Sequence, residues 1–353
     1  MHAFLIRHNI ADKKIAVAVS GGADSLALVL MAKEQLTVLG YTIIALTVDH
    51  GLRPSSLQEA EYVAEIMRQN NIEHHILTWK GAKPQQGIEE AARKARYKLL
   101  IEWCKLHQIN VLMTAHHAYD QAETFLMRLQ RGSGLSGLCC MREAVQKDGI
   151  YVIRPLLNTK PEALKLYLKQ KNIEWIEDES NQDNKYLRNL MRHYLPEFSI
   201  KTGISVDKII TAVNNLQCAE DFLQCQILQI KKAQIKILAK DVCFFNYSDF
   251  LSWHSQVQYQ IMADFCRRYY TPRAESVNKI VSSLKKLPFN GATLGDKEIF
   301  MYDKKVWIVP EVSSKHRSSN KEWKDFIMKH NEFIGMKIPH KARLAILMTE
   351  EII

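Results

Sequence analysis

Six consecutive residues near the amino end have the composition of a phosphate-binding loop. They lie between a short β-branched apolar run, Lys14 to Val19, and a longer apolar run that begins at Leu26. Glycines and serines let the backbone bend and direct several N–H groups toward one point, where the following helix adds partial positive charge. An acidic side chain in the loop could hold Mg²⁺ against a bound phosphate. The six residues are Ser20, Gly21, Gly22, Ala23, Asp24 and Ser25.

A simpler interpretation of the same residues is an ordinary turn from strand to helix. Asp24 or Ser25 would then cap the helix by accepting hydrogen bonds from its first N–H groups. The lysine of the GxxxxGK[ST] loop, which kinases and GTPases use, is absent from this chain. A loop without that lysine is suited to attack at the α-phosphate, with pyrophosphate as the leaving group.

Polar residues with chemical potential follow two other predicted strands. Asp49 and His50 end the strand Ile43 to Val48, and the segment His116 to Glu123 follows the strand Val111 to Thr114. Ligands of open α/β sheets bind beyond the carboxyl ends of the strands. We therefore expect one crevice to gather these two clusters and the glycine-containing loop.

Two pairs of arginines have helical spacing. Arg93 and Arg96 are three residues apart, and Arg188 and Arg192 are four apart, so each pair shares one face of a predicted helix. Such a face could meet phosphates, although a solvated surface with ordinary ion pairs is the alternative. Arg131 precedes a glycine-rich stretch that formally matches GxGxxG, but the match follows a helix, so we do not interpret it as a dinucleotide-binding motif.

The elements that must position these residues alternate between strand and helix. The pattern predicts strands within 14–19, 43–48, 74–77 and 111–114, with helices at 26–39, 56–70, 89–107 and 120–131. This alternation is typical of an α/β fold with a parallel sheet and helices on both faces. We expect a catalytic domain over 1–200, a mainly helical domain over 201–310 that ends in a small hairpin (299–309), and a short basic α+β segment over 311–353.

The composition agrees with a globular protein that binds a polyanion. Apolar residues make up 47% of the chain and charged residues 24%, and the net charge is +10. That charge favours nucleic acid as a partner. Seven cysteines without a CxxC pair indicate neither a disulfide framework nor a zinc site. No signal peptide and no apolar run of about 20 residues is apparent, so we expect a cytoplasmic protein without a membrane partner.

The chain resembles the PP-loop ATP pyrophosphatases, and within them the tRNA(Ile)-lysidine synthase family. The resemblance extends over roughly residues 13–195 in sequence order. It rests on the SGGADS loop and on blocks that begin at Val48, Gly87, Thr114, Asp120, Arg131, Arg154 and Asp178. The family's fold is that of the adenine nucleotide α-hydrolases, in agreement with the α/β prediction.

The resemblance implies an ATP-dependent ligase that forms a C–N bond on tRNA. ATP would adenylate the C2 oxygen of the wobble cytidine in an isoleucine tRNA with a CAU anticodon. Free L-lysine would then attack C2 through its ε-amine and displace AMP. The product, lysidine, pairs with A instead of G, which changes the tRNA from methionine to isoleucine specificity. A homodimer is compatible with the sequence.

The resemblance also distributes roles among the candidate residues. The residues of the loop, with Asp49 and His50, would bind ATP, and Asp24 would hold Mg²⁺. Asp120 and Glu123 would attract the lysine ammonium group and remove a proton from it. Arg96 and His117 would act at the reaction centre; either His116 or His117, but not both, is expected to be functional. The expected tRNA-binding residues are Arg93, Arg131, Arg188 and Arg192.

The chain departs from the family pattern at Tyr119, and three other functions are alternatives to lysidine formation. Tyr119 stands where the family commonly has an acidic residue, and the resemblance is thin beyond residue 200. A tRNA thiolase would use the same adenylation but deliver sulfur through cysteines. Amidating relatives would act on small substrates without tRNA, and an inactive RNA-binding relative would keep only the fold.

Overall fold

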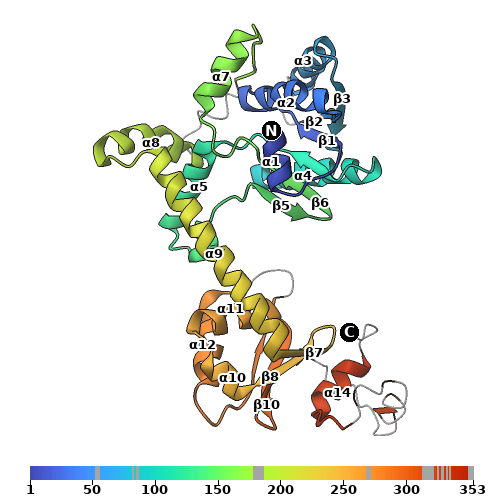
Figure 1. Cartoon of the computed structure of the whole chain (residues 1–353), viewed down its shortest axis with the longest axis vertical. Helices are drawn as coiled ribbons and strands as arrows, with labels where there is room; N and C mark the ends of the chain where they lie inside the picture. The colour runs from blue at the N-terminus through green and yellow to red at the C-terminus, as the bar shows by residue number, and fades with distance from the viewer. Residues whose placement is uncertain are drawn as a thin grey trace. The chain divides into compact units, whose positions relative to one another are not determined.

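The computed structural model describes most of the chain. It describes residues 1–51, 56–81, 83–84, 87–177, 187–267 and 272–311, together with 322–323, 326, 330, 333 and 335–348. The backbone separates into two compact units, residues 1–218 and 219–353. Figure 1 follows the chain from its amino end in blue to its carboxyl end in red.

The first unit contains a six-stranded sheet with the order β3-β2-β1-β4-β6-β5. All neighbouring strands are parallel except β5 and β6, which pair antiparallel as a hairpin. The strands are β1 (Lys14–Ala18), β2 (Thr42–Asp49), β3 (Glu73–Thr78), β4 (Val111–Met113), β5 (Ala144–Lys147) and β6 (Ile150–Ile153). The α/β prediction is confirmed, and the sheet is extended by a hairpin that the sequence pattern did not predict.

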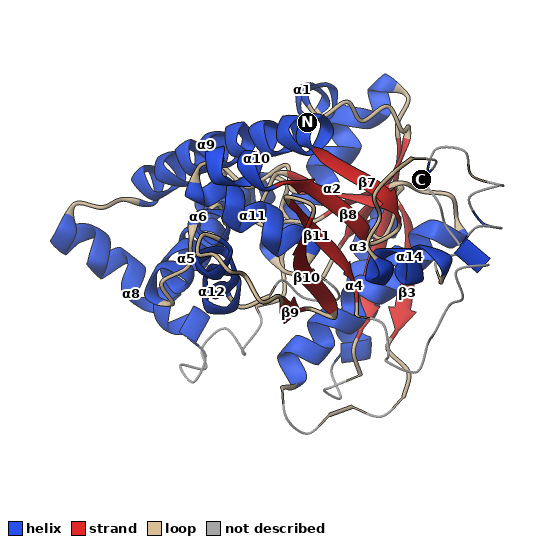
Figure 2. Cartoon of the chain, turned by 90° about the horizontal axis from the view of Figure 1, so that it is seen from below, coloured by secondary structure: helices blue, strands red, loops and turns tan. Residues whose placement is uncertain are grey.

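Helices cover both faces of this sheet, as expected from the apolar side chains on both sides of β1. Ile15 and Val17 pack with one helical layer, whereas Ala16 packs with Tyr97 and Leu100 on the other face. The helices are α1 (His2–Arg7), α2 (Ala23–Leu36), η1 (Thr37–Leu39), α3 (Ser56–Gln69), α4 (Ile88–Leu106), α5 (Ala118–Gln130), α6 (Leu135–Leu138) and α7 (Pro161–Gln170). Figure 2 shows the strands in red and the helices in blue.

Two further helices extend the first unit past the expected boundary at residue 200. Helix α8 (Leu187–Thr202) and the beginning of α9 (Val206–Gln234) pack against α5. Leu195 and Val213 are buried with Ala122 in this cluster, so these helices share the core of the first unit up to residue 218. Pro196 lies inside α8.

The second unit is built on an antiparallel sheet with the order β7-β8-β11-β10-β9. Its elements are β7 (Ile235–Ala239), β8 (Val242–Asn246), α10 (Tyr247–Ser252), α11 (Ser255–Phe265), α12 (Ala274–Leu284), β9 (Ala292–Leu294), β10 (Lys297–Tyr302), β11 (Lys305–Pro310) and α14 (His340–Leu347). The expected hairpin is β10–β11, and it is the centre of a larger sheet. One sheet face packs against α10–α12, and Trp323 and α14 cover the other, so the described residues after 311 belong to this unit.

Candidate active site

The loop after β1 has the backbone geometry that its glycines predict. Gly21 has φ +88°, in the left-handed region, and a Cβ atom there would lie 2.7 Å from Cδ1 of Ile176. The Ile176 amide donates a hydrogen bond of 3.0 Å to the Gly21 carbonyl oxygen. The chain after α7 therefore fixes the loop from outside, and glycine is required at position 21 by both space and conformation.

The serines stabilise the loop, and neither of them caps the following helix. The Ser25 hydroxyl donates to the Gly22 carbonyl oxygen (3.0 Å) and accepts from the Ser20 amide (3.1 Å). Gly22 is the N-cap of α2, and no side chain caps that helix. The structure therefore contradicts the interpretation as a simple capped turn. The positive end of α2 is available to an anion.

Asp24 joins the loop after β1 to the loop after β4. Its Oδ2 atom lies 3.4 Å from Nε2 of His117, whereas its Oδ1 atom is buried without a hydrogen-bond partner among the described residues. His117 is the N-cap of α5: its Nδ1 atom accepts from the Asp120 amide, and the Asp120 carboxylate accepts from the His117 amide. Because Nδ1 is an acceptor, the Nε2–H group donates toward Asp24.

The acidic pair on α5 and the arginine pair on α8 form one ionic network. Glu123, which is completely buried, accepts from Nε of Arg188 at 2.8 Å and from Nε of Arg192 at 2.7 Å. Arg188 also donates to Oδ1 of Asp120 at 2.8 Å. The side chains of both arginines are partly exposed to solvent, in contrast to Glu123. The four residues therefore fasten α8 to the first two turns of α5, beside the glycine-containing loop.

Two neighbouring histidines have opposite pKa shifts because different charges surround them. Burial by itself would lower the pKa of His117, but the carboxylates of Asp24 and Asp120 outweigh burial and raise it. Burial, assisted by Arg154 and Arg93, lowers the pKa of His116 to about 3, although Asp120 opposes this shift. His117 thus faces the acidic side of the site and His116 the basic side.

Asp49 and His50 lie at the end of β2, near Arg96. An Asp49 carboxylate oxygen accepts from the Gly51 amide (2.8 Å), and Nδ1 of His50 is buried without a hydrogen-bond partner in the described part of the chain. Burial and the charge of Arg96 lower the pKa of His50. Burial also lowers the pKa of Arg96, with smaller contributions from the charges of Arg93 and Arg188. The carboxyl ends of β1, β2 and β4 therefore surround one region.

Two of the arginines predicted to bind tRNA, Arg93 and Arg131, lie outside the cluster around Asp24. Arg93 is exposed on α4 and lines a separate cavity that is described below. Arg131 is the exposed C-cap of α5. A rise of 1.5 Å per residue places it about 20 Å along the helix axis from the end that carries His117. It does not join the cluster around Asp24.

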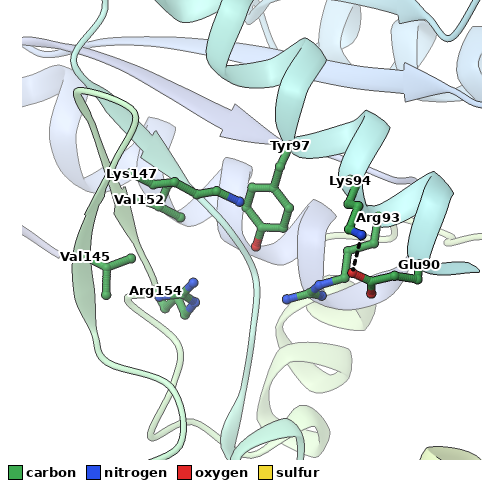
Figure 3. Close-up of a pocket in the computed structure, with 8 residues that line it drawn as sticks. All are labelled: Glu90, Arg93, Lys94, Tyr97, Val145, Lys147, Val152 and Arg154. Atoms are coloured by element: carbon green, nitrogen blue, oxygen red, sulfur yellow. Dashed lines mark ion pairs between the residues drawn. The ribbon is translucent and has the colours of Figure 1, made fainter. Parts of the chain in front are cut away.

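Two cationic residues of the β5–β6 hairpin, Lys147 and Arg154, were given no role in the sequence analysis, although Arg154 begins one of the family-like blocks. They line a cavity of about 250 Å³ with Glu90, Arg93, Lys94, Tyr97, Val145 and Val152 (Figure 3). The available signal was the dipeptide Asp148-Gly149 between two runs of strand-forming residues. Both residues have positive φ, +50° and +84°, as in the two-residue turn of a hairpin.

The residues around Asp24 fit a magnesium ion only if the nucleotide supplies most of its ligands. The described residues contain no group of three or more His, Cys, Asp or Glu side chains that could hold a metal. The unpartnered Oδ1 atom of Asp24 is the type of ligand that Mg²⁺ takes alongside substrate phosphates and water.

The cysteines lack the features of sulfur-transfer residues. All seven are free thiols, and four of them are buried. Burial raises the pKa of Cys104 and Cys266 to about 12 and that of Cys140 to about 11, so these thiols stay protonated at neutral pH.

We also find no helix in the described ranges with the length and apolar composition to cross a membrane.

Comparisons with known proteins agree with this architecture. Residues 3–198 match the model of the PP-loop domain family. The solved structure of the U34-tRNA thiolase NcsA from Methanococcus maripaludis, with its [4Fe–4S] cluster, aligns over 61% of this chain and 80% of its own. The TM-score is 0.51 and the identity is 15%, so the likeness shows the fold alone.

The sequence relatives are more specific. The tRNA(Ile)-lysidine synthase of Wolbachia pipientis wMel is 35% identical over 86% of this chain and 72% of its own length. That of Orientia tsutsugamushi (strain Boryong) is 37% identical over 71% of this chain, which covers 58% of that relative. On this similarity, and on its PP-loop domain, the chain belongs to the tRNA(Ile)-lysidine synthase family.

Proposed function

We propose that this protein ligates L-lysine to C2 of the wobble cytidine in an isoleucine tRNA with a CAU anticodon, with ATP as the activating substrate. The observation that carries the proposal is the position of Asp24. Its unpartnered carboxylate oxygen lies in the first turn of a helix that no side chain caps, and its other oxygen faces His117. ATP, Mg²⁺ and the attacking cytidine oxygen can meet at such a position.

The loop and α2 would bind the phosphates of ATP. Backbone N–H groups at the start of α2 and the Ser20 hydroxyl would neutralise charge as the cytidine oxygen attacks the α-phosphorus and pyrophosphate leaves. A magnesium ion held by Asp24 would supply further charge neutralisation at the phosphates. His117 would act as a positioning residue, since its Nε2–H group orients the Asp24 carboxylate.

The second step needs a site for an amine that is protonated in solution. The ε-ammonium group of free lysine has a pKa of about 10.4, so a carboxylate must attract it and a base must accept a proton. Asp120 and Glu123 supply the carboxylates, but both accept hydrogen bonds from Arg188 and both are near Arg192. We infer that these arginines turn toward tRNA phosphates when tRNA binds, which releases carboxylate oxygens for the lysine ammonium group.

Mass spectrometry of tRNA nucleosides tests this function. Incubation of the protein with the unmodified isoleucine tRNA, ATP and lysine should give lysidine, and AMP release should require both tRNA and lysine. Labelled lysine should not be retained on the tRNA unless ATP is present. AMP formation at full rate with ammonia or sulfide in place of lysine would contradict the assignment.

A further inference from the structure

The cavity beside α4 has an excess of positive charge. Four cationic side chains line it against one carboxylate, and that carboxylate, Glu90, lies 3.7 Å from Nζ of Lys94. The three remaining cations, Arg93, Lys147 and Arg154, form no ion pair with any described residue. Like charges brought together without counter-ions raise the free energy of the folded protein, which makes a bound anion the natural partner.

Arg154 is built into this cavity. It is only 8% exposed, and it immediately follows β6 at the carboxyl edge of the sheet. Its Nη1 atom donates to the Arg142 carbonyl oxygen at 2.8 Å, but its Nε atom is buried without a hydrogen-bond partner among the described residues. A buried guanidinium group whose hydrogen bonds and charge are incompletely matched is costly, and an oxyanion in the cavity that the residue lines would supply a charged acceptor.

The hairpin and α4 direct the other side chains to the same place. Val145 pairs with Val152, and Lys147 pairs with Ile150, so all four side chains are on one face of the hairpin, the face with buried Ile150 and Val152. Nζ of Lys147 lies 4.3 Å from the centroid of the Tyr97 ring. Figure 3 shows the Tyr97 hydroxyl group pointing into the space between Arg154 and Arg93.

We propose that this cavity binds a backbone phosphodiester of the tRNA substrate. The inference rests on the proposed function, because it assigns a contact for the tRNA in that reaction. The Arg154 guanidinium group would donate to a phosphate oxygen, Lys147 and Arg93 would neutralise its charge at the open side, and the Tyr97 hydroxyl would donate a further hydrogen bond. The low pKa of His116 is consistent with this basic side of the site.

The charge and openness of the cavity distinguish a phosphodiester from lysine. A single carboxylate of free lysine needs one arginine, whereas three unpaired cations suit a continuous polyanion. Arg93 and Lys147 are exposed at the rim, where an extended chain can pass without being enclosed. Tyr97 is buried, so its ring is not free to stack on a base, and the site would read the backbone without base specificity.

Titration of tRNA binding against salt tests the proposal. The variants Lys147→Met and Arg93→Met remove one exposed charge each and keep the apolar stem of the side chain. Each should weaken binding of the full-length unmodified tRNA several-fold and reduce the slope of log Kd against log salt concentration by about 0.7 to 0.9. Lys105→Met, an exposed lysine in the last turn of α4, is the matched control and should change neither value.

A substituted tRNA identifies the phosphate. Single neutral methylphosphonates are placed along the anticodon arm of a tRNA ligated from synthetic halves. At one position the substitution should weaken binding to the wild-type protein but not to Lys147→Met. If every position weakens binding to the two proteins equally, or if Lys147→Met raises KM for lysine or ATP and leaves tRNA binding unchanged, the proposal is wrong.

These measurements separate the pocket from the proposed activity. Filter binding of tRNA needs no turnover, so failure of the wild-type protein to make lysidine would contradict the function and leave the binding result readable. Lysidine formation with KM for tRNA unchanged in Lys147→Met and Arg93→Met would contradict the pocket and support the function. Circular dichroism of each variant confirms that it folds.

Discussion

Two clusters of charged residues at the carboxyl edge of the first sheet differ in how their arginines are partnered. In the network on α5 and α8, Arg188 and Arg192 meet Asp120 and Glu123. In the cavity on α4 and the β5–β6 hairpin, Arg93, Lys147 and Arg154 form no ion pair with a carboxylate of the described residues. Before tRNA binds, the paired arginines hold two helices together, whereas the unpaired cations already leave charge for a ligand. Arginine at a helical spacing does not by itself distinguish these two roles.

The largest expected effect comes from Asp24, which is linked through His117 to Asp120 of the network on α5 and α8. The variant Asp24→Asn keeps the shape but removes the charge, and we expect AMP formation to fall by about 100- to 1,000-fold because phosphate charge is no longer balanced. Pyrophosphate release in the presence of tRNA measures this. An active Asp24→Asn enzyme with an unchanged dependence on Mg²⁺ would remove Asp24 from the site.

Breaking the ion pairs between α5 and α8 should destabilise the folded protein. Glu123→Gln leaves Arg188 and Arg192 with an uncharged partner in a buried position, and the free energy of unfolding should drop by about 3 to 5 kcal/mol. Urea denaturation measures it. Glu65→Gln, which breaks an exposed pair with Arg68 on α3, is the control and should leave the midpoint unchanged. Equal losses for the two variants would contradict a structural role for the cluster.

The loop beside both clusters can be tested by adding one methyl group. Gly21→Ala combines an unfavourable positive φ, about 1 kcal/mol, with a clash against Ile176 that should add about 1 to 3 kcal/mol. Gly149→Ala has nearly the same φ, +84° against +88°, and nothing within 4 Å of the new Cβ atom. The difference between their unfolding free energies therefore isolates the contacts with Ile176 and with Val63, whose Cγ2 atom would lie 3.1 Å from the new Cβ atom, and equal values would mean that these contacts contribute nothing.

The smallest but most direct signal comes from the two adjacent histidines. Nuclear magnetic resonance should show His117 titrating above the ordinary histidine pKa and His116 remaining neutral down to about pH 3. Asp24→Asn should lower the pKa of His117, because it removes one of the carboxylates that raise it. Titration of both histidines at the ordinary value would contradict the division into an acidic and a basic side.

The raised pKa of His117 also gives a pH dependence of stability. Its protonated form is favoured in the folded state, so its contribution is fully present below the unfolded pKa of about 6.5. The contribution is lost as pH rises through the folded pKa. The denaturation midpoint of the wild-type protein should therefore fall more over this window than that of His117→Gln.

Much of the fold could be predicted from sequence because local signals agreed with it. The apolar runs that end at Val19 and Val48 are β1 and β2, and the predicted helix 56–70 is α3. Local signals do not account for Pro196, which lies inside α8, where packing of Leu195 on α5 supports the helix despite the missing N–H group. The strands β7 and β8 lie in a region that was expected to be mainly helical, because short apolar runs fit either period.

The site was only partly predictable for a related reason. The loop from Ser20 to Ser25 has a sequence signature, whereas the pairing of Arg188 with Glu123 joins residues 65 positions apart. Spacing placed each pair on one helical face but carried no information on what that face meets. Lys147 and Arg154 line the same cavity only through a hairpin register, which depends on the turn at Asp148-Gly149.

The hydrogen bond from Ile176 to Gly21 has a thermodynamic consequence for nucleotide recognition. A loop whose carbonyl is tied to a neighbouring segment loses most of its conformational freedom when the protein folds, before any triphosphate arrives. Binding of the nucleotide then carries a smaller entropic penalty, because the loop does not have to be ordered when the nucleotide arrives. Amide exchange in this corner should already be slow in the free enzyme, and adding a non-hydrolysable ATP analogue should change it little.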